Sequence, residues 1–298
     1  MSTQTVHKAV PLREMFSTWP VVTDGAWGTE LQKRGLALGD CPDAWNLQHP
    51  DRVAAIARTY RDAGCNAVLT NTFRANAISL AAYGLAGRVK DINAAGVRLS
   101  KQAGDDVHVI ASMGPVGKLL AIGEIMREDL YRVFSEQAAA LADSGADALL
   151  IETMSDLEEA LVAVRASKLT GLPVIVSFVF DTGRNKDRTM TGVTPEQAAT
   201  AMAEAGVDAV GSNCGNGIEQ LIPICRRMRA VTTLPLWMKA NAGMPDIHGE
   251  QIVYRTTAEE FASFAPALRD AGASFIGGCC GTTPRFMNAV RAALYPCA

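Results

Sequence analysis

The sequence has few aromatic residues, little net charge and no long apolar run. Aromatic residues make up 6% of the 298 residues, and 28 Lys and Arg against 31 Asp and Glu leave a net charge of −3. Without an excess of positive charge, a nucleic-acid partner is not expected. No stretch reaches the roughly 18 uninterrupted apolar residues of a membrane helix, and the first residues, MSTQTVHKAVPLREMF, lack the apolar core of a signal peptide. We therefore expect a cytoplasmic protein with no membrane partner.

The number of cysteines is odd. The chain has seven cysteines, at positions 41, 65, 214, 225, 279, 280 and 297. In a reducing compartment, a long chain with such a set is more typical of reactive or metal-binding thiols than of a disulfide framework.

Short apolar runs alternate with longer segments of helical spacing, eight times along the chain. The runs are rich in Val, Ile, Leu and Ala, which is typical of strands buried on both faces of a parallel sheet. They cover residues 21–26, 66–73, 107–115, 146–153, 173–180, 207–214, 235–243 and 273–280. The helix-like segments cover residues 50–63, 88–104, 128–144, 156–169, 194–205, 217–231, 257–271 and 284–294.

Proline, threonine and glycine mark the ends of several predicted helices. Prolines fall in first-turn positions, and two threonines are expected as N-caps. These residues are Pro50, Pro195, Pro284, Thr194 and Thr283. Glycine ends four segments just before the next apolar run, where a left-handed C-cap is expected. These glycines are Gly64, Gly145, Gly206 and Gly272.

Eight β-then-α units predict an α/β fold of the (β/α)8 TIM barrel type. A doubly wound open sheet with eight strands would give a similar rhythm. A barrel of about 250 residues forms one domain, and no Pro/Ser-rich linker or charge block divides the chain. We therefore expect a single domain over residues 1–298, with residues 1–20 as a lead-in arm.

In a parallel barrel, the carboxyl ends of the strands and the loops after them form the active face. The polar residues, cysteines and glycines at the predicted strand ends are Asp24, Gly25, Thr70, Asn71, Thr72, Gly114, Glu152, Asp181, Asn213, Cys214, Asn241, Cys279 and Cys280. These residues are expected to converge in space.

Three of the seven cysteines lie at these strand ends. Cys279 and Cys280 cannot easily form a disulfide with each other, because neighbouring Cα atoms are only ~3.8 Å apart. The flanking glycines let the backbone curl so that both sulfur atoms can turn inward, towards Cys214. Three thiolates suit Zn²⁺ and leave its fourth position open, as in catalytic zinc sites. The alternative is that these cysteines are small buried hydrophobic residues.

The motifs that carry these residues resemble those of the homocysteine S-methyltransferases. This zinc-dependent barrel also forms the N-terminal domain of cobalamin-dependent methionine synthase and the core of betaine–homocysteine methyltransferase. The similarity runs through TDGAWGTELQKRG (23–35), LTNTF (69–73), ALLIET (148–153), GSNCG (211–215), NAG (241–243) and GGCCGTTP (277–284).

The resemblance implies a zinc-dependent methyltransferase in which Cys214, Cys279 and Cys280 hold Zn²⁺ and the thiol of homocysteine is the fourth ligand. Coordination deprotonates the thiol, and its sulfur then attacks the methyl group of a donor. The resemblance assigns substrate binding to Asp24, Gly25, Thr70 and Glu152. Taken alone, Asp24 is typical of a turn residue, and Glu152 of an ion pair inside a barrel. Asn213, beside a ligand, could tune a sulfur atom by a hydrogen bond.

The methyl donor is not encoded in these strand-end motifs. Glycine betaine is the donor that we expect, and S-methylmethionine or S-adenosylmethionine is the alternative. Such cations bind against the faces of aromatic rings. The aromatic residues expected to line the donor site are Trp27, Phe73, Trp45 and Tyr83. However, animal betaine enzymes have tyrosines where this chain has Arg74 and Thr153.

A second hypothesis is that a separate corrinoid protein supplies the methyl group. The local sequence resembles the methionine-synthase domain, but no cobalamin-domain sequence follows it. A homo-oligomer is left open. A non-catalytic zinc- or thiol-binding barrel is the alternative outside catalysis. Residues 181–192, DTGRNKDRTMTG, are expected as either a solvated loop or part of a lid or donor surface.

Overall fold

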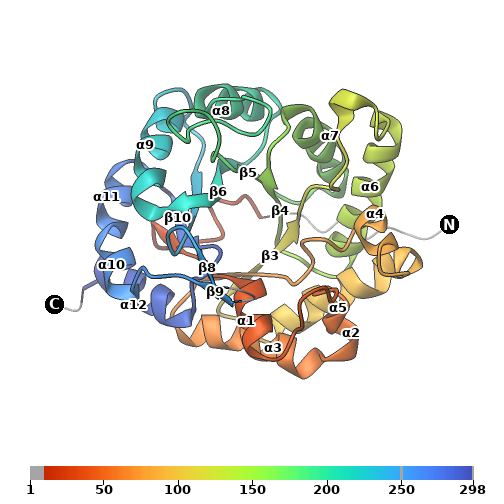
Figure 1. Cartoon of the computed structure of the whole chain (residues 1–298), viewed down its shortest axis with the longest axis horizontal. Coiled ribbons are helices and arrows are strands. Elements are labelled where there is room, and N and C mark those ends of the chain that lie inside the picture. Colours follow the sequence, from red (N-terminus) through yellow and green to blue (C-terminus); the bar gives the residue numbers. More distant parts are fainter. Residues whose placement is uncertain (1–9, 249–250, 297–298) are drawn as a thin grey trace.

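Eight parallel strands form a barrel, and helices surround it (Figure 1). The computed structural model describes residues 10–248 and 251–296. The strands are β1 (Val21–Val22), β2 (Ala67–Leu69), β3 (His108–Met113), β4 (Ala148–Met154), β5 (Val174–Phe178), β6 (Ala209–Gly217), β7 (Leu236–Asn241) and β10 (Phe275–Gly278). Their spatial order is β1-β10-β7-β6-β5-β4-β3-β2, and a parallel bridge from Thr23 to Ala67 joins the two ends. The predicted TIM barrel is confirmed, and the open-sheet alternative is wrong.

Helices follow the strands in the predicted alternation. They are α1 (Trp27–Lys33), α2 (Trp45–Gln48), α3 (Pro50–Asp62), α4 (Ala77–Ala81), α5 (Val89–Lys101), α6 (Arg127–Asp143), α7 (Leu157–Ser167), α8 (Pro195–Glu204), α9 (Ile218–Arg229), α10 (Ala258–Ser263), α11 (Ala265–Asp270) and α12 (Pro284–Leu294). Three 3₁₀ turns lie at Ala86–Arg88, Leu120–Ile122 and Lys168–Thr170, and strands β8 (Asp246–His248) and β9 (Gln251–Val253) form a hairpin after β7. None of the described helices is long and apolar enough to cross a membrane.

The predicted helix over 257–271 is two helices, α10 and α11. Pro266 lies in the first turn of α11 and has no N–H to continue the hydrogen-bond ladder of α10. At the other predicted ends, Thr194 forms a capping box with Gln197, whereas the side chain of Thr283 makes no capping bond. The four glycines expected at helix ends all have positive φ, between 71° and 105°.

The strand pattern follows from two separate cores. On β3, Val109, Ala111 and Met113 face the surrounding helices, while Ile110 points into the barrel. Alternate residues face opposite sides of a strand, so every strand needs apolar residues on both. This requirement explains the nearly continuous apolar runs in the sequence.

The lead-in arm plugs one end of the barrel. Leu12 and Phe16 are buried against Val21, Trp237 and Phe275, which lie at or near the starts of their strands. The part of the predicted arm before residue 10 lies outside the described residues. The opposite end is formed by the carboxyl ends of the strands and the loops that follow them.

Candidate active site

Three cysteines meet at the carboxyl ends of β6 and β10, as the strand-end rule predicted. We call Cys214, Cys279 and Cys280 the thiol cluster. Their Sγ atoms all lie within 4.8 Å of one another, and those of Cys214 and Cys280 are 3.8 Å apart. All three side chains are half-buried. Of the other cysteines, Cys41, Cys65 and Cys225 are buried elsewhere as free thiols, and Cys297 lies outside the described residues.

A bulge in β6 projects Cys214 into the mouth of the barrel. Asn213 pairs with Lys239 and Gly217 with Asn241, so four steps along β6 match two along β7. Cys214 and Gly215 take up the excess in left-handed conformations, with φ of 62° and 71°. Bulges re-aim side chains next to active sites, and this one turns a strand residue towards the cysteines of β10.

A tight turn after β10 carries the other two thiols. The backbone N–H of Cys279 donates to Ala240 at 2.6 Å, and the carbonyl of Cys280 accepts from Ala242 at 2.9 Å, so the turn is tied to β7. The turn closes through Thr282, whose hydroxyl donates to the carbonyl of Cys279 at 2.7 Å. Gly281 has φ of 81°, a conformation that glycine adopts without strain.

The thiol cluster fits a tetrahedral Zn²⁺ site. Zn–S bonds of about 2.3 Å at the tetrahedral angle separate two sulfur atoms by about 3.8 Å, which is the distance between Cys214 and Cys280. Asn241, beside the cluster, donates its amide N–H to the carbonyl of Gly215 at 3.0 Å, while its buried Oδ1 has no partner among the described residues. Three soft thiols at one point are ligands that Zn²⁺ prefers.

Contacts among the three thiols lower the pKa of one of them and raise the pKa of the other two. Hydrogen bonds from Cys279 and Cys280 lower the pKa of the Cys214 thiol. The pKa of the other two thiols is raised, chiefly by their contact with Cys214. The trio therefore favours one negative charge over three, a charge distribution that a bound cation would change.

A second bulge positions Glu152 at the end of β4. Ile151 pairs with Val176 and Met154 with Phe178, so β4 has one residue in excess, and Thr153 has a φ of 61°. Glu152 is 7% exposed as a residue, and its carboxylate accepts hydrogen bonds from the Ser112 hydroxyl and, at 3.4 Å, from the Asn213 amide. Burial raises the pKa of Glu152 to about 7, while neighbouring Lys239 opposes the rise.

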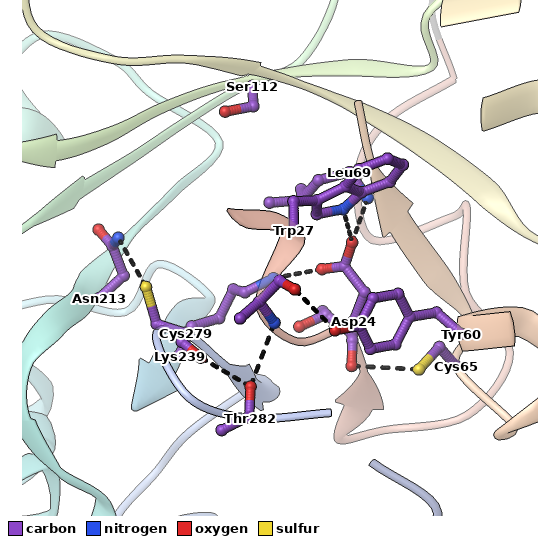
Figure 2. Close-up of polar contacts among 12 residues, drawn as sticks. Asp24, Trp27, Tyr60, Cys65, Leu69, Ser112, Asn213, Lys239, Cys279 and Thr282 are labelled. Atoms are coloured by element: carbon purple, nitrogen blue, oxygen red, sulfur yellow. Dashed lines mark hydrogen bonds and ion pairs between the residues drawn. The ribbon is translucent and has the colours of Figure 1, made fainter. Parts of the chain in front are cut away.

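Asp24 lies at the floor of the site with both carboxylate oxygens occupied (Figure 2). Oδ1 forms an ion pair with Lys239, and Oδ2 accepts from the Trp27 indole and the Leu69 backbone N–H, both at 2.7 Å. A Cβ on the neighbouring Gly25 would lie 2.7 Å from the hydroxyl of Thr282. Gly25 therefore lets the β1 turn approach the turn that carries Cys279 and Cys280.

Asn213 connects the thiol cluster to the acidic side of the site. Its Oδ1 accepts from the Thr153 backbone at 2.8 Å and the Ser177 hydroxyl at 2.6 Å. Its Nδ2 lies 3.4 Å from Glu152 and 3.9 Å from the sulfur of Cys279. Figure 2 shows the contact with Cys279. This fully buried amide fixes the two groups relative to each other.

Thr70 is buried and bonded to its neighbours rather than exposed in the mouth. Its hydroxyl lies 2.5 Å from that of Thr72 and accepts from the Ser112 backbone at 3.0 Å. Asn71 and Asn46 join the loops after β2 and β1 by hydrogen bonds within 3.0 Å. These contacts hold the LTNTF segment in place around Thr70.

The expected aromatic wall is only partly present. Trp27 and Phe73 are half-buried. The Phe73 ring packs so closely on Gly114 that a Cβ added there would lie 2.5 Å from a ring carbon. Trp45 is 3% exposed and packs against His49, and Tyr83 is exposed. Tyr254, an aromatic residue that the sequence did not point to, lies against Gly281. Burial, together with the neighbouring thiol cluster, raises its pKa to about 12.

The segment 181–192 is folded back onto the barrel. Asn216 donates to the carbonyls of Phe180 at 3.0 Å and Lys186 at 3.4 Å. Arg227 of α9 pairs with Asp187 at 2.5 Å. The segment is thus anchored beside the Cys214 bulge, while several of its charged side chains remain exposed.

Lys239, Ser112 and Tyr254 are the site residues that sequence reasoning missed. A signal for Lys239 was available, since a lysine within an apolar run that is buried on both faces requires a buried partner. Ser112 and Tyr254 carried no comparable signal, because a small hydroxyl in a strand and a tyrosine in a loop occur in any protein.

Comparisons with known proteins agree with this geometry. The model of a family described as homocysteine S-methyltransferase matches residues 21–294. Methionine synthases of Mycobacterium tuberculosis and Mycobacterium leprae are 33% and 32% identical over 95% and 96% of this chain. The chain spans about a quarter of the length of these relatives, 25% in each case.

Solved structures of the homocysteine methyltransferase MmuM from Escherichia coli share the whole architecture. The oxidized form is 26% identical, with a TM-score of 0.78 over 95% of this chain and 99% of that one. The metallated form is 25% identical, with a TM-score of 0.77 over 93% and 96% of the two chains.

Proposed function

The chain belongs to the homocysteine S-methyltransferase family of methyltransferases, and from this premise we propose that it methylates the sulfur of homocysteine, with Zn²⁺ held by Cys214, Cys279 and Cys280. The observation that carries the proposal is the thiol cluster, with three Sγ atoms within 4.8 Å of one another at the carboxyl ends of β6 and β10. Bound Zn²⁺ would keep a substrate thiol deprotonated at neutral pH, where a free thiol with a pKa of about 8.5 is mostly protonated.

The acidic side of the site would receive the ammonium group of the substrate. Asp24 and Glu152 bring two carboxylates to one buried region, and Lys239 balances only one of them. Backbone N–H groups around Gly25 and the hydroxyl of Thr70 are the proposed contacts of the substrate carboxylate. Holding the amino-acid end here and the sulfur at the thiol cluster would orient the substrate, a major source of rate enhancement.

We propose glycine betaine as the methyl donor. Its quaternary ammonium suits aromatic faces, and Trp27, Phe73 and Tyr254 are half-buried at the mouth of the site. The homocysteine thiolate would form a bond to the methyl carbon while the carbon–nitrogen bond breaks and leaves its electron pair on dimethylglycine. The thiol proton goes to solvent, so the step needs no general base.

A second donor class is favoured by the mycobacterial relatives, which are methionine synthases about four times as long as this chain. A methyl group delivered by a separate corrinoid protein would reach the same sulfur through the open mouth. S-methylmethionine and S-adenosylmethionine are small-molecule alternatives. In each case Cys214, Cys279 and Cys280 would have the same task.

The test is methionine formation by the zinc-loaded chain from homocysteine, followed by mass spectrometry. Glycine betaine, S-methylmethionine, S-adenosylmethionine, methylfolate and methylcobalamin are offered separately. Turnover with betaine confirms the donor, and turnover with another donor replaces betaine while keeping the reaction. Bound zinc without turnover of any donor would favour the non-catalytic zinc-binding barrel. The six described cysteines are free, which supports the proposed cytoplasmic setting, where thiols stay reduced.

A further inference from the structure

Strained backbone is concentrated around the β6 bulge. Among the described residues, three residues other than glycine have positive φ: Thr153 at 61°, Lys186 at 53° and Cys214 at 62°. Cys214 lies in the bulge itself, and the other two are hydrogen-bonded to Asn213 and Asn216 of the same strand. Such conformations persist only where the surrounding contacts hold them, and they cluster at functional sites.

Thr153 is the least expected residue of the three. A β-branched side chain is a genuine outlier at positive φ, whereas glycine adopts this conformation without strain. A residue of a regular parallel strand also directs its backbone N–H to an adjacent strand. Thr153 donates instead to the side chain of Asn213 on β6, although β5 lies between β4 and β6. A threonine held in this way points to a task that glycine cannot perform.

Thr153 binds both ends of the Asn213 amide. Its backbone N–H donates to Oδ1 at 2.8 Å, and its hydroxyl oxygen accepts from Nδ2 at 2.7 Å. Ser177 of β5 donates to the same Oδ1 at 2.6 Å, so both lone pairs of this oxygen are used. A backbone N–H can only donate, so turning the amide over would set two donors against each other. The orientation of this fully buried amide is therefore fixed.

One N–H of Asn213 is left over after these contacts. The amide nitrogen carries two N–H groups, and the hydroxyl of Thr153 receives one of them. The other faces the Glu152 carboxylate at 3.4 Å and the sulfur of Cys279 at 3.9 Å, the contact drawn in Figure 2. Outer contacts of this kind orient the ligands of a metal and tune them.

We propose that Thr153 is a positioning residue for the thiol cluster. Its strained backbone and its hydroxyl fix the Asn213 amide so that an N–H is directed at the sulfur of Cys279, where it would stabilise the thiolate. The inference rests on the proposed function, because it concerns the thiols as ligands of Zn²⁺.

The experiment measures the zinc affinity of the full chain by competition with a chromogenic chelator, without homocysteine or a methyl donor. Thr153→Val keeps the branched shape and removes the hydroxyl, and it should weaken zinc binding about tenfold. Thr153→Ser keeps the hydroxyl and should stay within about threefold of the wild type. With Co²⁺ as the probe, Thr153→Val should shift the thiolate-to-metal charge-transfer band to longer wavelength, because a sulfur atom loses a hydrogen bond.

Two further variants separate this role from a merely structural one. Lys186→Gly relieves another residue of positive φ and keeps the carbonyl that Asn216 contacts, so its zinc affinity should stay within about threefold of the wild type. Because Thr153 acts through Asn213, adding Thr153→Val to Asn213→Ala should weaken zinc binding by no more than about twofold. Where Thr153→Val fails to fold, Thr153→Gly removes the same hydroxyl without strain and takes its place.

An unchanged zinc affinity and cobalt band in Thr153→Val would overturn the proposal while leaving the zinc site intact. A full further loss in the Asn213→Ala background would overturn it too, because Thr153 would then act by another route. An equal loss in Lys186→Gly would assign the effect to backbone strain, and an equal loss in Thr153→Ser would exclude the hydroxyl. A wild type that binds no zinc would refute the proposed function, and this inference with it.

Discussion

The two sides of the site are built in opposite ways. The thiol cluster lies on irregular backbone, a β6 bulge and a turn after β10, and its three side chains remain half-exposed. The acidic side, with Asp24, Glu152 and Lys239, is buried. Asp24 bonds to Lys239 and to strand backbone, and Glu152 bonds to neutral neighbouring side chains.

This difference separates what each side does. Among the described residues, no cationic side chain forms an ion pair with the sulfur atoms, and their spacing suits a cation, so under the proposed function a metal ion completes the thiol cluster. On the acidic side, Lys239 already pairs with Asp24, and under the proposed function the substrate ammonium supplies the remaining positive charge. Substitutions on the two sides should therefore have different signatures, on metal binding and chemistry for the thiols and on substrate affinity and pH dependence for the carboxylates.

The largest effect is expected for Cys214→Ala. Removing one of three thiols should abolish zinc retention and lower turnover at least about 1,000-fold, because the substrate thiol loses the ion that activates it. Zinc content and methionine formation are measured on the same samples. Cys225→Ala, which removes a buried thiol on α9, is the control and should keep both. Loss of thermal stability with turnover intact would instead assign the cluster a structural role.

Asn213→Ala should break the link between the two sides. Its amide contacts both Glu152 and the sulfur of Cys279, and loss of such outer contacts typically lowers metal affinity or activity about 10- to 100-fold. Competition with a chromogenic zinc chelator measures the affinity. Asn71→Ala, a buried amide outside the cluster, should cost stability but not zinc. Equal zinc loss in both variants would contradict a specific role for Asn213.

Glu152→Gln should change a pH profile as well as affinity. Burial raises the pKa of Glu152 to about 7 from 4.5, so the folded state keeps a proton that the unfolded chain has already released. The stability of the metal-free chain should therefore fall as the pH rises from 4.5 to 7, and Glu152→Gln should remove part of this slope. Homocysteine binding should tighten as Glu152 ionises, and the variant should weaken it about tenfold at pH 8.

Glu159→Gln is the matched control for this profile. Burial also raises the pKa of Glu159 to about 7, but its carboxylate accepts from the Val116 backbone at 2.8 Å, outside the acidic side. This variant should flatten the stability profile in urea unfolding at pH 5 and pH 8 and leave homocysteine binding unchanged. An unchanged pH profile for Glu152→Gln would contradict the buried-acid interpretation.

The smallest effect is expected for the comparison of Gly281→Ala with Gly145→Ala. The measured quantity is the difference between the losses of unfolding free energy that the two substitutions cause. Both glycines have positive φ, of 81° and 89°, but only at Gly281 does a Cβ meet a neighbour, the Tyr254 ring at 2.3 Å. Each substitution should cost about 1 kcal/mol or more from strain, and Gly281→Ala about 1–3 kcal/mol more from overpacking. Equal losses would mean that Tyr254 moves freely and does not pack on the thiol turn.

Local sequence patterns predicted the strands and helix ends well, because each of these elements depends mainly on the residues of its own segment. All eight apolar runs are strands, and the glycines after DA, DS and EA end helices with positive φ. The error over 257–271 came from reading through Pro266, a local signal that was present. The short helices α1, α2 and α4 were missed because loop segments of four to seven residues carry little periodicity.

By itself, the sequence determined the alternation of strands and helices, the ends at which chemistry gathers and the three cysteines that meet there. Only the tertiary structure decided how those ends are used. Two bulges and the pairing of Lys239 with Asp24 depend on which strands are neighbours and on how far each is shifted along the next. Hydrogen-bond register and buried charge pairing join residues far apart in the chain, such as Asp24 and Lys239, which are 215 positions apart, and no local pattern reports them.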